Sequence, residues 1–103
     1  MQERRAEPRF QVELNAQWET LKSQGRGSIT DLSSNGCFVL TGGEFTVGEL
    51  ACLQIKAAEQ YATVWGEIAY TTAEIGFAMR FVFAGEDRRA LDALLDELGA
   101  EDV

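Results

Sequence analysis

The chain alternates hydrophobic and polar side chains over most of its length. The clearest stretch begins at Phe10 and ends at Trp18, where every second residue is apolar and the residues between are Gln, Glu or Asn. A period of two places the apolar side chains on one face of a β-strand, so this stretch predicts a half-buried strand. Five further strands are predicted near 27–32, 37–40, 50–56, 62–70 and 75–83, with turns at 23–27, 34–36, 41–43 and 58–61.

The number and length of these strands indicate how they are arranged. Six short strands joined by tight turns favour an antiparallel barrel that is closed or nearly closed, which also removes unpaired sheet edges. Beyond the last strand the apolar period becomes that of an amphipathic helix, predicted over 86–98 and ended by Gly99. The predicted fold class is therefore mainly β, a six-stranded barrel over 10–83 with one C-terminal α-helix. The helix would turn four leucines toward the barrel: Leu91, Leu94, Leu95 and Leu98.

Composition bounds the possible partners. With 103 residues, of which 46% are hydrophobic, the chain is expected to form a single domain with its own core. Its formal net charge of −8 disfavours DNA or RNA, because binding to either draws on many basic residues. A small nucleotide needs only a local cationic pocket and stays compatible with that charge. The apolar runs are too short for membrane insertion, and the N-terminal MQERRAEPR lacks the apolar stretch of a signal peptide.

The two cysteines, Cys37 and Cys52, have no CxxC spacing, and the chain has no histidine. We interpret both as buried small hydrophobes and expect no disulfide scaffold, no metal site and no cofactor. Free thiols in a chain without a signal peptide fit the reducing cytoplasm. The commonest general base is absent, and no Ser, Cys or Lys lies in a recognisable nucleophile motif, so we do not expect an enzyme.

Arg5 and Arg9 lie four residues apart in the charged segment 1–9, which we expect to form a mobile arm because little in it is apolar. Pro8 between them disfavours a helix, on which such a pair would be an ordinary solvated face. Arginine presents a planar fork of donors that fits phosphate oxygens or the O6/N7 edge of guanine. The pair therefore suggests binding of a phosphate or a guanine base.

A second motif, Asp-x-Ser-x-x-Gly, follows some twenty residues later as Asp31, Ser33 and Gly36. Asp is acceptor-only, which suits the N1–H and N2–H donors of guanine, and Ser either donates or accepts. Gly lets a ligand come close to the backbone. Alone, the segment is an ordinary strand end and turn; together with the arginines, it is matched to a guanine nucleotide that carries phosphates.

These two motifs resemble those of the PilZ family, bacterial receptor domains for cyclic di-GMP, which carry RxxxR near the N-terminus and [D/N]xSxxG downstream. Both motifs are intact here, and a glycine before the last strand, Gly76, extends the resemblance over nearly the whole chain. The resemblance implies the same barrel and output through an unidentified partner protein, as in adaptors for motility, exopolysaccharide synthesis or virulence. It also implies that five residues bind cyclic di-GMP: Arg5, Arg9, Asp31, Ser33 and Gly36.

Two further residues are candidates. Arg4 directly precedes the arginine pair, and a third arginine would help to neutralise two stacked cyclic di-GMP molecules. In the family such an arginine is associated with an interleaved ligand pair, so two molecules per chain are expected. Tyr70 is either a core or rim aromatic, or a ring that stacks on guanine. Arg88 and Arg89, at the start of the helix, are interpreted as a salt-bridged surface.

Two alternative functions remain open from the sequence. Some PilZ domains bind proteins without any nucleotide, although their motifs are typically degenerate and those of this chain are not. A small oligonucleotide-binding barrel is the other alternative, and the net charge of −8 weighs against it.

Overall fold

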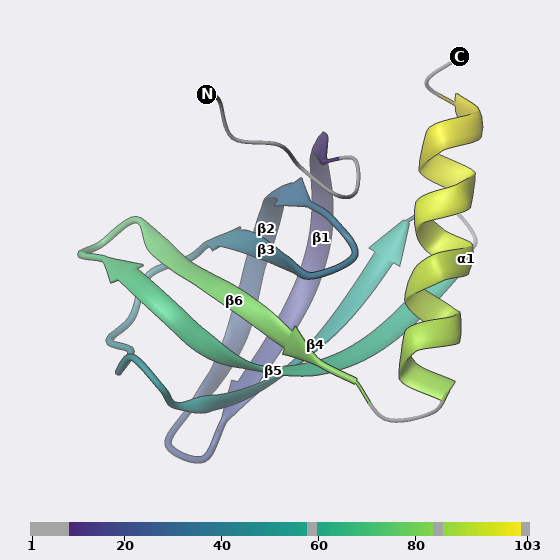
Figure 1. Ribbon diagram of the computed structural model, residues 1–103. Coiled ribbons are helices and arrows are strands. Elements are labelled where there is room, and N and C mark those ends of the chain that lie inside the picture. The colour runs from purple at the N-terminus through teal and green to yellow at the C-terminus, as the bar shows by residue number, and fades with distance from the viewer. Residues whose placement is uncertain (1–8, 58–59, 84–85, 102–103) are drawn as a thin grey trace, which may run out of the picture.

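The computed structural model describes residues 9–57, 60–83 and 86–101. Six strands close into an antiparallel barrel in the order β1-β2-β3-β6-β5-β4 (Figure 1). This confirms the predicted fold class, while all of the predicted mobile arm except Arg9 lies outside the described residues. The elements are β1 (Phe10–Thr20), β2 (Gln24–Leu32), β3 (Gly36–Leu40), β4 (Leu50–Ala57), β5 (Gln60–Thr72), β6 (Gly76–Val82) and α1 (Glu86–Glu101).

The alternating side chains fill the barrel interior, as their period predicts. Ala16 and Trp18 of β1 are buried, and their neighbours Gln17 and Glu19 are exposed. Apolar side chains from all six strands and from α1 form one core cluster, so the helix completes the barrel rather than forming a second layer of its own. The largest fully buried side chains are Phe77, Ile29, Leu32, Leu53, Ile55, Ile68, Leu91, Leu94, Val39 and Val64.

Strand β2 begins at Gln24, so the predicted turn over 23–27 is wrong. The two glycines that suggested this turn lie within the strand. A Cβ atom on Gly25 would lie 2.7 Å from the Trp18 ring, and one on Gly27 would lie 2.7 Å from the Leu40 carbonyl oxygen. The glycines are therefore explained by close packing against the core rather than by a change of chain direction.

The other ends of elements also differ from the prediction. Gln60 and Tyr61 belong to β5 rather than to a turn, since they pair with the end of β4. Ile75 and Phe83 lie just outside β6. Helix α1 continues three residues past the predicted end at 98, because a single glycine at 99 weakens a helix without ending it when a good helix former such as Ala100 follows.

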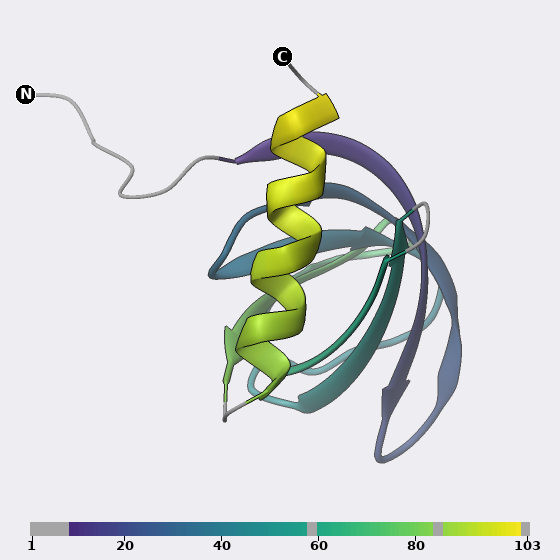
Figure 2. The same cartoon turned by 90° about the vertical axis from the view of Figure 1, so that its right-hand side faces the viewer.

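Helix α1 packs against β5 (Figure 2). Its Leu91 and Leu94 are fully buried. Its last turns lie at the same end of the barrel as the start of β1, and Leu98 lines a hollow of about 580 Å³ together with residues 9–14. The helix therefore borders the strand that follows the arginine motif. No helix among the described residues is long and apolar enough to cross a membrane.

Candidate functional site

A β-bulge turns Asp31 toward the outer surface. Ile29 and Leu32 of β2 are both fully buried although they lie three residues apart, which a regular strand does not allow because its side chains alternate. The pairing of β2 with β3 shifts by one residue between Ile29 and Asp31, and this irregularity restores the alternation. Without it, Asp31 would face the core beside Ile29. The bulge thus makes an acidic residue available for binding at the surface.

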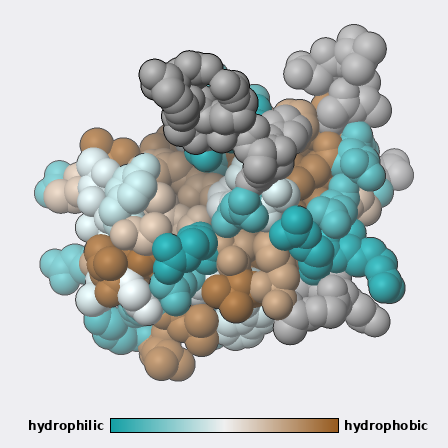
Figure 3. Space-filling view, viewed as in Figure 1, coloured by the Kyte–Doolittle hydropathy of each residue, from teal (hydrophilic) through white to brown (hydrophobic). Residues whose placement is uncertain are grey.

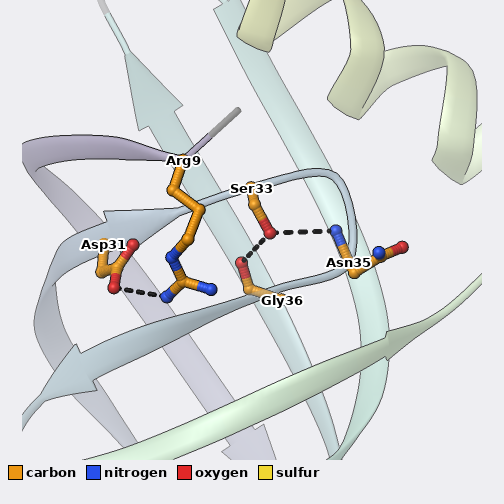
Figure 4. A network of polar contacts seen from close by, with 5 residues as sticks. All are labelled: Arg9, Asp31, Ser33, Asn35 and Gly36. Atoms are coloured by element: carbon orange, nitrogen blue, oxygen red, sulfur yellow. Dashed lines mark hydrogen bonds and ion pairs between the residues drawn. The ribbon is translucent and has the colours of Figure 1, made fainter. Parts of the chain in front are cut away.

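Arg9 forms an ion pair with this carboxylate through its Nη2 and Asp31 Oδ2 (Figure 4). Both side chains are partly exposed, 38% for Arg9 and 32% for Asp31, so the pair contributes at most about 1 kcal/mol. The other carboxylate oxygen, Asp31 Oδ1, is buried and has no hydrogen-bond partner among the described residues. An unsatisfied buried acceptor is uncommon and indicates a place where a donor from a ligand would be favourable.

Ser33 holds the loop between β2 and β3 in shape. Its hydroxyl accepts a hydrogen bond from the Asn35 backbone N–H at 3.2 Å and donates to the Gly36 carbonyl at 3.5 Å (Figure 4). The Ser33 backbone N–H also donates to the Gly36 carbonyl, at 2.9 Å. Ser33 is only 3% exposed, so in this structure it orders the loop and does not present its hydroxyl to solvent.

Gly36 is the first residue of β3, and neither it nor Asn35 has a positive φ angle. The chain reverses direction between β2 and β3 close to the predicted turn at 34–36, but this turn does not require glycine for a positive φ angle. The need for glycine comes from strand β6 instead, because a Cβ atom on Gly36 would lie 2.4 Å from the Met79 carbonyl oxygen. The backbone of the motif is consequently held tightly against β6.

The strand register places an aromatic pair on the same outer face as Asp31. Asp31 pairs with Phe38 of β3, Phe38 with Ala78 of β6, and Ala78 with Tyr70 of β5. The Phe38 and Tyr70 ring centroids are 6.2 Å apart, with Ala78 between their backbones. Phe38 was not predicted, since it lies in a short continuous apolar run whose facing direction cannot be read without the register.

Tyr70 is 56% exposed, so it does not share the buried face of β5 with Ile68. The pairing of β5 with β6 shifts between Ile68 and Tyr70, and this second bulge reverses the facing direction after the fully buried Ile68. The bulge leaves the ring available for contact with a planar ligand, and it excludes the interpretation of Tyr70 as a core aromatic.

Charged side chains border this face. Arg80, which pairs with Gly36 across the strands, forms an ion pair of 2.5 Å with Glu67 of β5. Arg88 of α1 donates to the Ser34 carbonyl at 3.2 Å, a contact that the interpretation of a salt-bridged helix surface missed. Figure 3 shows hydrophobic patches among hydrophilic side chains on one face of the molecule. Arg4 and Arg5 lie outside the described residues, so the structure does not place them beside this face.

The cysteines differ from each other. Cys37 is buried, and burial raises the pKa of its thiol far above the ordinary value, with the nearby Asp31 carboxylate acting in the same direction. Cys52 is only half-buried, contrary to the expectation that both are core residues. Among the described residues, no group of three or more His, Cys, Asp or Glu side chains is placed to hold a metal ion.

Comparison with known families supplies the identity of the fold. A family model for the PilZ domain matches residues 3–97, most of the chain. The chain belongs to the PilZ family. The matched residues include both arginines of the first motif and the whole of the second, and they extend into α1, which is therefore part of the PilZ match. None of the curated proteins matches this chain.

Solved structures, among them two PilZ domains, share the fold at low sequence identity. The PilZ domain of YcgR from Escherichia coli with c-di-GMP has a TM-score of 0.78 and 16% identity, covering 97% of this chain and 95% of that one. The PilZ domain of CeSA from a cellulose-synthesizing bacterium has a TM-score of 0.75 and 11% identity, covering 89% and 98%. The K. pneumonia MrkH–c-di-GMP complex has a TM-score of 0.75 and 20% identity; it covers 97% of this chain, which spans 53% of MrkH.

Proposed function

We propose that this PilZ domain binds cyclic di-GMP on the outer barrel face that carries Arg9, Asp31, Phe38 and Tyr70. The observation that carries the proposal is Asp31, which a bulge turns outward and which keeps one buried acceptor oxygen unsatisfied among the described residues. The N1–H and N2–H groups of a guanine are donors of the kind this carboxylate lacks. Two structural neighbours, those of YcgR and MrkH, are c-di-GMP complexes, which supports the same ligand.

In the proposal, Arg9 exchanges its ion pair with Asp31 for a contact with the ligand. Its ion pair with Asp31 is partly exposed and therefore weak, so a ligand phosphate replaces the carboxylate at little cost. In the proposal Arg9 and Arg5 then bind phosphates and guanine edges, and Arg4 and Arg5 reach the ligand from the arm, which becomes ordered. Phe38 and Tyr70 offer a ring surface on which a base stacks, and Gly36 lets the ligand approach the backbone.

Calorimetric titration tests the ligand and its selectivity. We expect cyclic di-GMP to bind with clear preference over GTP, cyclic GMP and cyclic di-AMP. In Asp31→Ala, the preference for cyclic di-GMP over cyclic di-AMP should fall by about 5- to 100-fold, because the acceptor for the guanine donors is gone. A parent protein that binds none of the four nucleotides would instead favour the rival proposal of a nucleotide-independent interaction module.

The stoichiometry depends on Arg4. Two cyclic di-GMP molecules with interleaved bases carry twice the charge of one, and a third arginine in reach of the site helps to neutralise it. We expect two ligand molecules per chain, falling toward one in Arg4→Ala before binding is lost. Titration at protein concentrations well above the dissociation constant measures this number. A parent stoichiometry of one that Arg4→Ala leaves unchanged would contradict a role for Arg4.

The signal would pass to a partner protein in the cytoplasm. No constellation for catalysis is expected from the sequence, so the proposed output is a ligand-dependent change in the surface that a partner recognises. We expect this change at the loop 33–36, because the loop contacts both β6 and α1.

A further inference from the structure

Arg88 connects the helix to the ligand-binding motif. Its Nη1 donates to the Ser34 carbonyl at 3.2 Å, across 54 residues of sequence. Ser34 is the fourth of the six residues of Asp-x-Ser-x-x-Gly, and it lies between Ser33 and Asn35, whose backbone N–H donates to the Ser33 hydroxyl. The neighbouring Asn35 carbonyl accepts from the Phe81 backbone N–H at 2.8 Å. The loop is thus held by β6 on one side and by α1 on the other.

The position of Arg88 within α1 makes this contact notable. It is the third residue of the helix, where the helix dipole disfavours a positive charge. Three contacts compensate: the Ser34 carbonyl, the Phe83 ring 4.8 Å from the guanidinium carbon, and Asp92 at 3.6 Å. Asp92 contacts the guanidinium from α1 and Phe83 contacts it from just beyond the end of β6, and both contacts favour its orientation toward the loop.

The far end of the same helix reaches the other motif. Leu98 and the residues from Arg9 to Leu14 line one hollow, and the four leucine positions of α1 pack against the barrel core. Helix α1 therefore borders both segments that carry the proposed ligand contacts. A rigid helix in contact with two such segments responds to the position of either.

We propose that Arg88 is a positioning residue that links the docking of α1 to occupancy of the cyclic di-GMP site. This inference rests on the proposed function. Arg88 holds the loop at 33–36 in the binding geometry, and ligand binding in turn stabilises the docked helix. Because linkage is reciprocal, loss of Arg88 weakens ligand binding and also removes the effect of the ligand on α1. Ligand binding then increases the order of α1, whose exposed side chains include acidic ones, so the order of this helix reports ligand binding.

The test compares Arg88→Ala with Arg89→Ala, which removes the same charge from the next residue of the helix. Among the described residues, Arg89 has no hydrogen bond or ion pair with the loop. We expect Arg88→Ala to bind cyclic di-GMP about five- to tenfold more weakly than the parent, from one lost charge-assisted hydrogen bond. Arg89→Ala should change affinity by less than about twofold, since only screened long-range charge is lost. Circular dichroism checks that both variants keep the fold.

Amide hydrogen exchange supplies the readout that a purely structural role would not change. In the parent and in Arg89→Ala, saturating cyclic di-GMP should slow exchange both in the loop at 33–36 and in the helix at 90–98. In Arg88→Ala at saturating ligand, the loop should still gain protection, and the helix should not. Equal or tighter affinity in Arg88→Ala, or ligand-induced protection of the helix that persists without Arg88, would overturn the link.

These outcomes separate the two proposals. If the parent does not bind cyclic di-GMP, the proposed function fails, and the link to the ligand fails with it. If the parent binds and Arg88→Ala behaves like Arg89→Ala in both measurements, only the link fails, and the receptor function stands.

Discussion

Arg9→Ala is expected to lower the affinity for cyclic di-GMP by about 10- to 100-fold, because each guanidinium donates charge-assisted hydrogen bonds of about 1.5–3 kcal/mol. A second effect adds to this loss. In the structure Arg9 neutralises Asp31, so its removal leaves a carboxylate to repel the ligand phosphates. Arg5→Ala should have a similar effect if the arm binds as proposed. Calorimetry of each variant against the parent measures the change.

Arg26→Ala is the matched control for Arg9→Ala. It removes an exposed arginine from β2, the strand that carries Asp31, five positions away and so about 17 Å along the strand. The loss of one unit of charge is the same, and the contacts at the proposed site are untouched. If both arm variants bind like the parent and like Arg26→Ala while keeping the fold, the arginine motif is not the ligand site.

Gly36→Ala is expected to destabilise the barrel by about 2–4 kcal/mol, one of the largest effects available to a single methyl group in this chain. The added Cβ would lie 2.4 Å from the Met79 carbonyl oxygen, a backbone atom that cannot rotate away. Strands β3 and β6 would have to separate locally, and the binding loop at the start of β3 would move with them. For a domain of this size the midpoint of thermal unfolding should fall by about 10 °C or more.

Gly42→Ala provides the control for stability. A Cβ atom at this position meets nothing within 4 Å, and the residue does not have a positive φ angle, so alanine should be neutral or slightly stabilising. Thermal unfolding followed by circular dichroism compares the two variants. If Gly36→Ala and the parent unfold at the same temperature, β6 can move to accommodate the added methyl group. Close approach of the ligand would then remain as the main reason for glycine at this position.

The sequence by itself determined the barrel, the helix and the chemistry of the proposed site. Strict alternation from Phe10 to Trp18 is readable because a strand with one buried face leaves a period of two in composition. The leucine spacing in 86–98 is readable because a helix with one buried face leaves a period of about 3.6 in composition. Residue type alone also gave the guanine-matched set of Arg, Asp and Ser, since hydrogen-bonding capacity is a property of each side chain and not of its surroundings.

Only the tertiary structure decided which way several side chains face. The bulges before Asp31 and Tyr70 each insert one residue relative to the partner strand, and nothing in the residue types marks them. The sequence therefore left Tyr70 open between a core or rim aromatic and a ring that stacks on guanine, and it did not single out Phe38, whose apolar run hides its direction. The register across β2, β3, β6 and β5 brings both rings onto the face of Asp31.

Contacts between distant residues were likewise beyond the reach of the sequence. The pairing of Arg88 with Asp92 is visible as an i,i+4 spacing, but its hydrogen bond to Ser34 depends on how α1 docks beside the loop. Gly25, Gly27 and Gly36 suggest turns in sequence because glycine is common there, whereas in the folded barrel their neighbours leave no room for a side chain. Local sequence patterns contain the periodicity of each element and the chemistry of its side chains. Steric exclusion and hydrogen bonds between distant residues arise only when the strands have closed into the barrel.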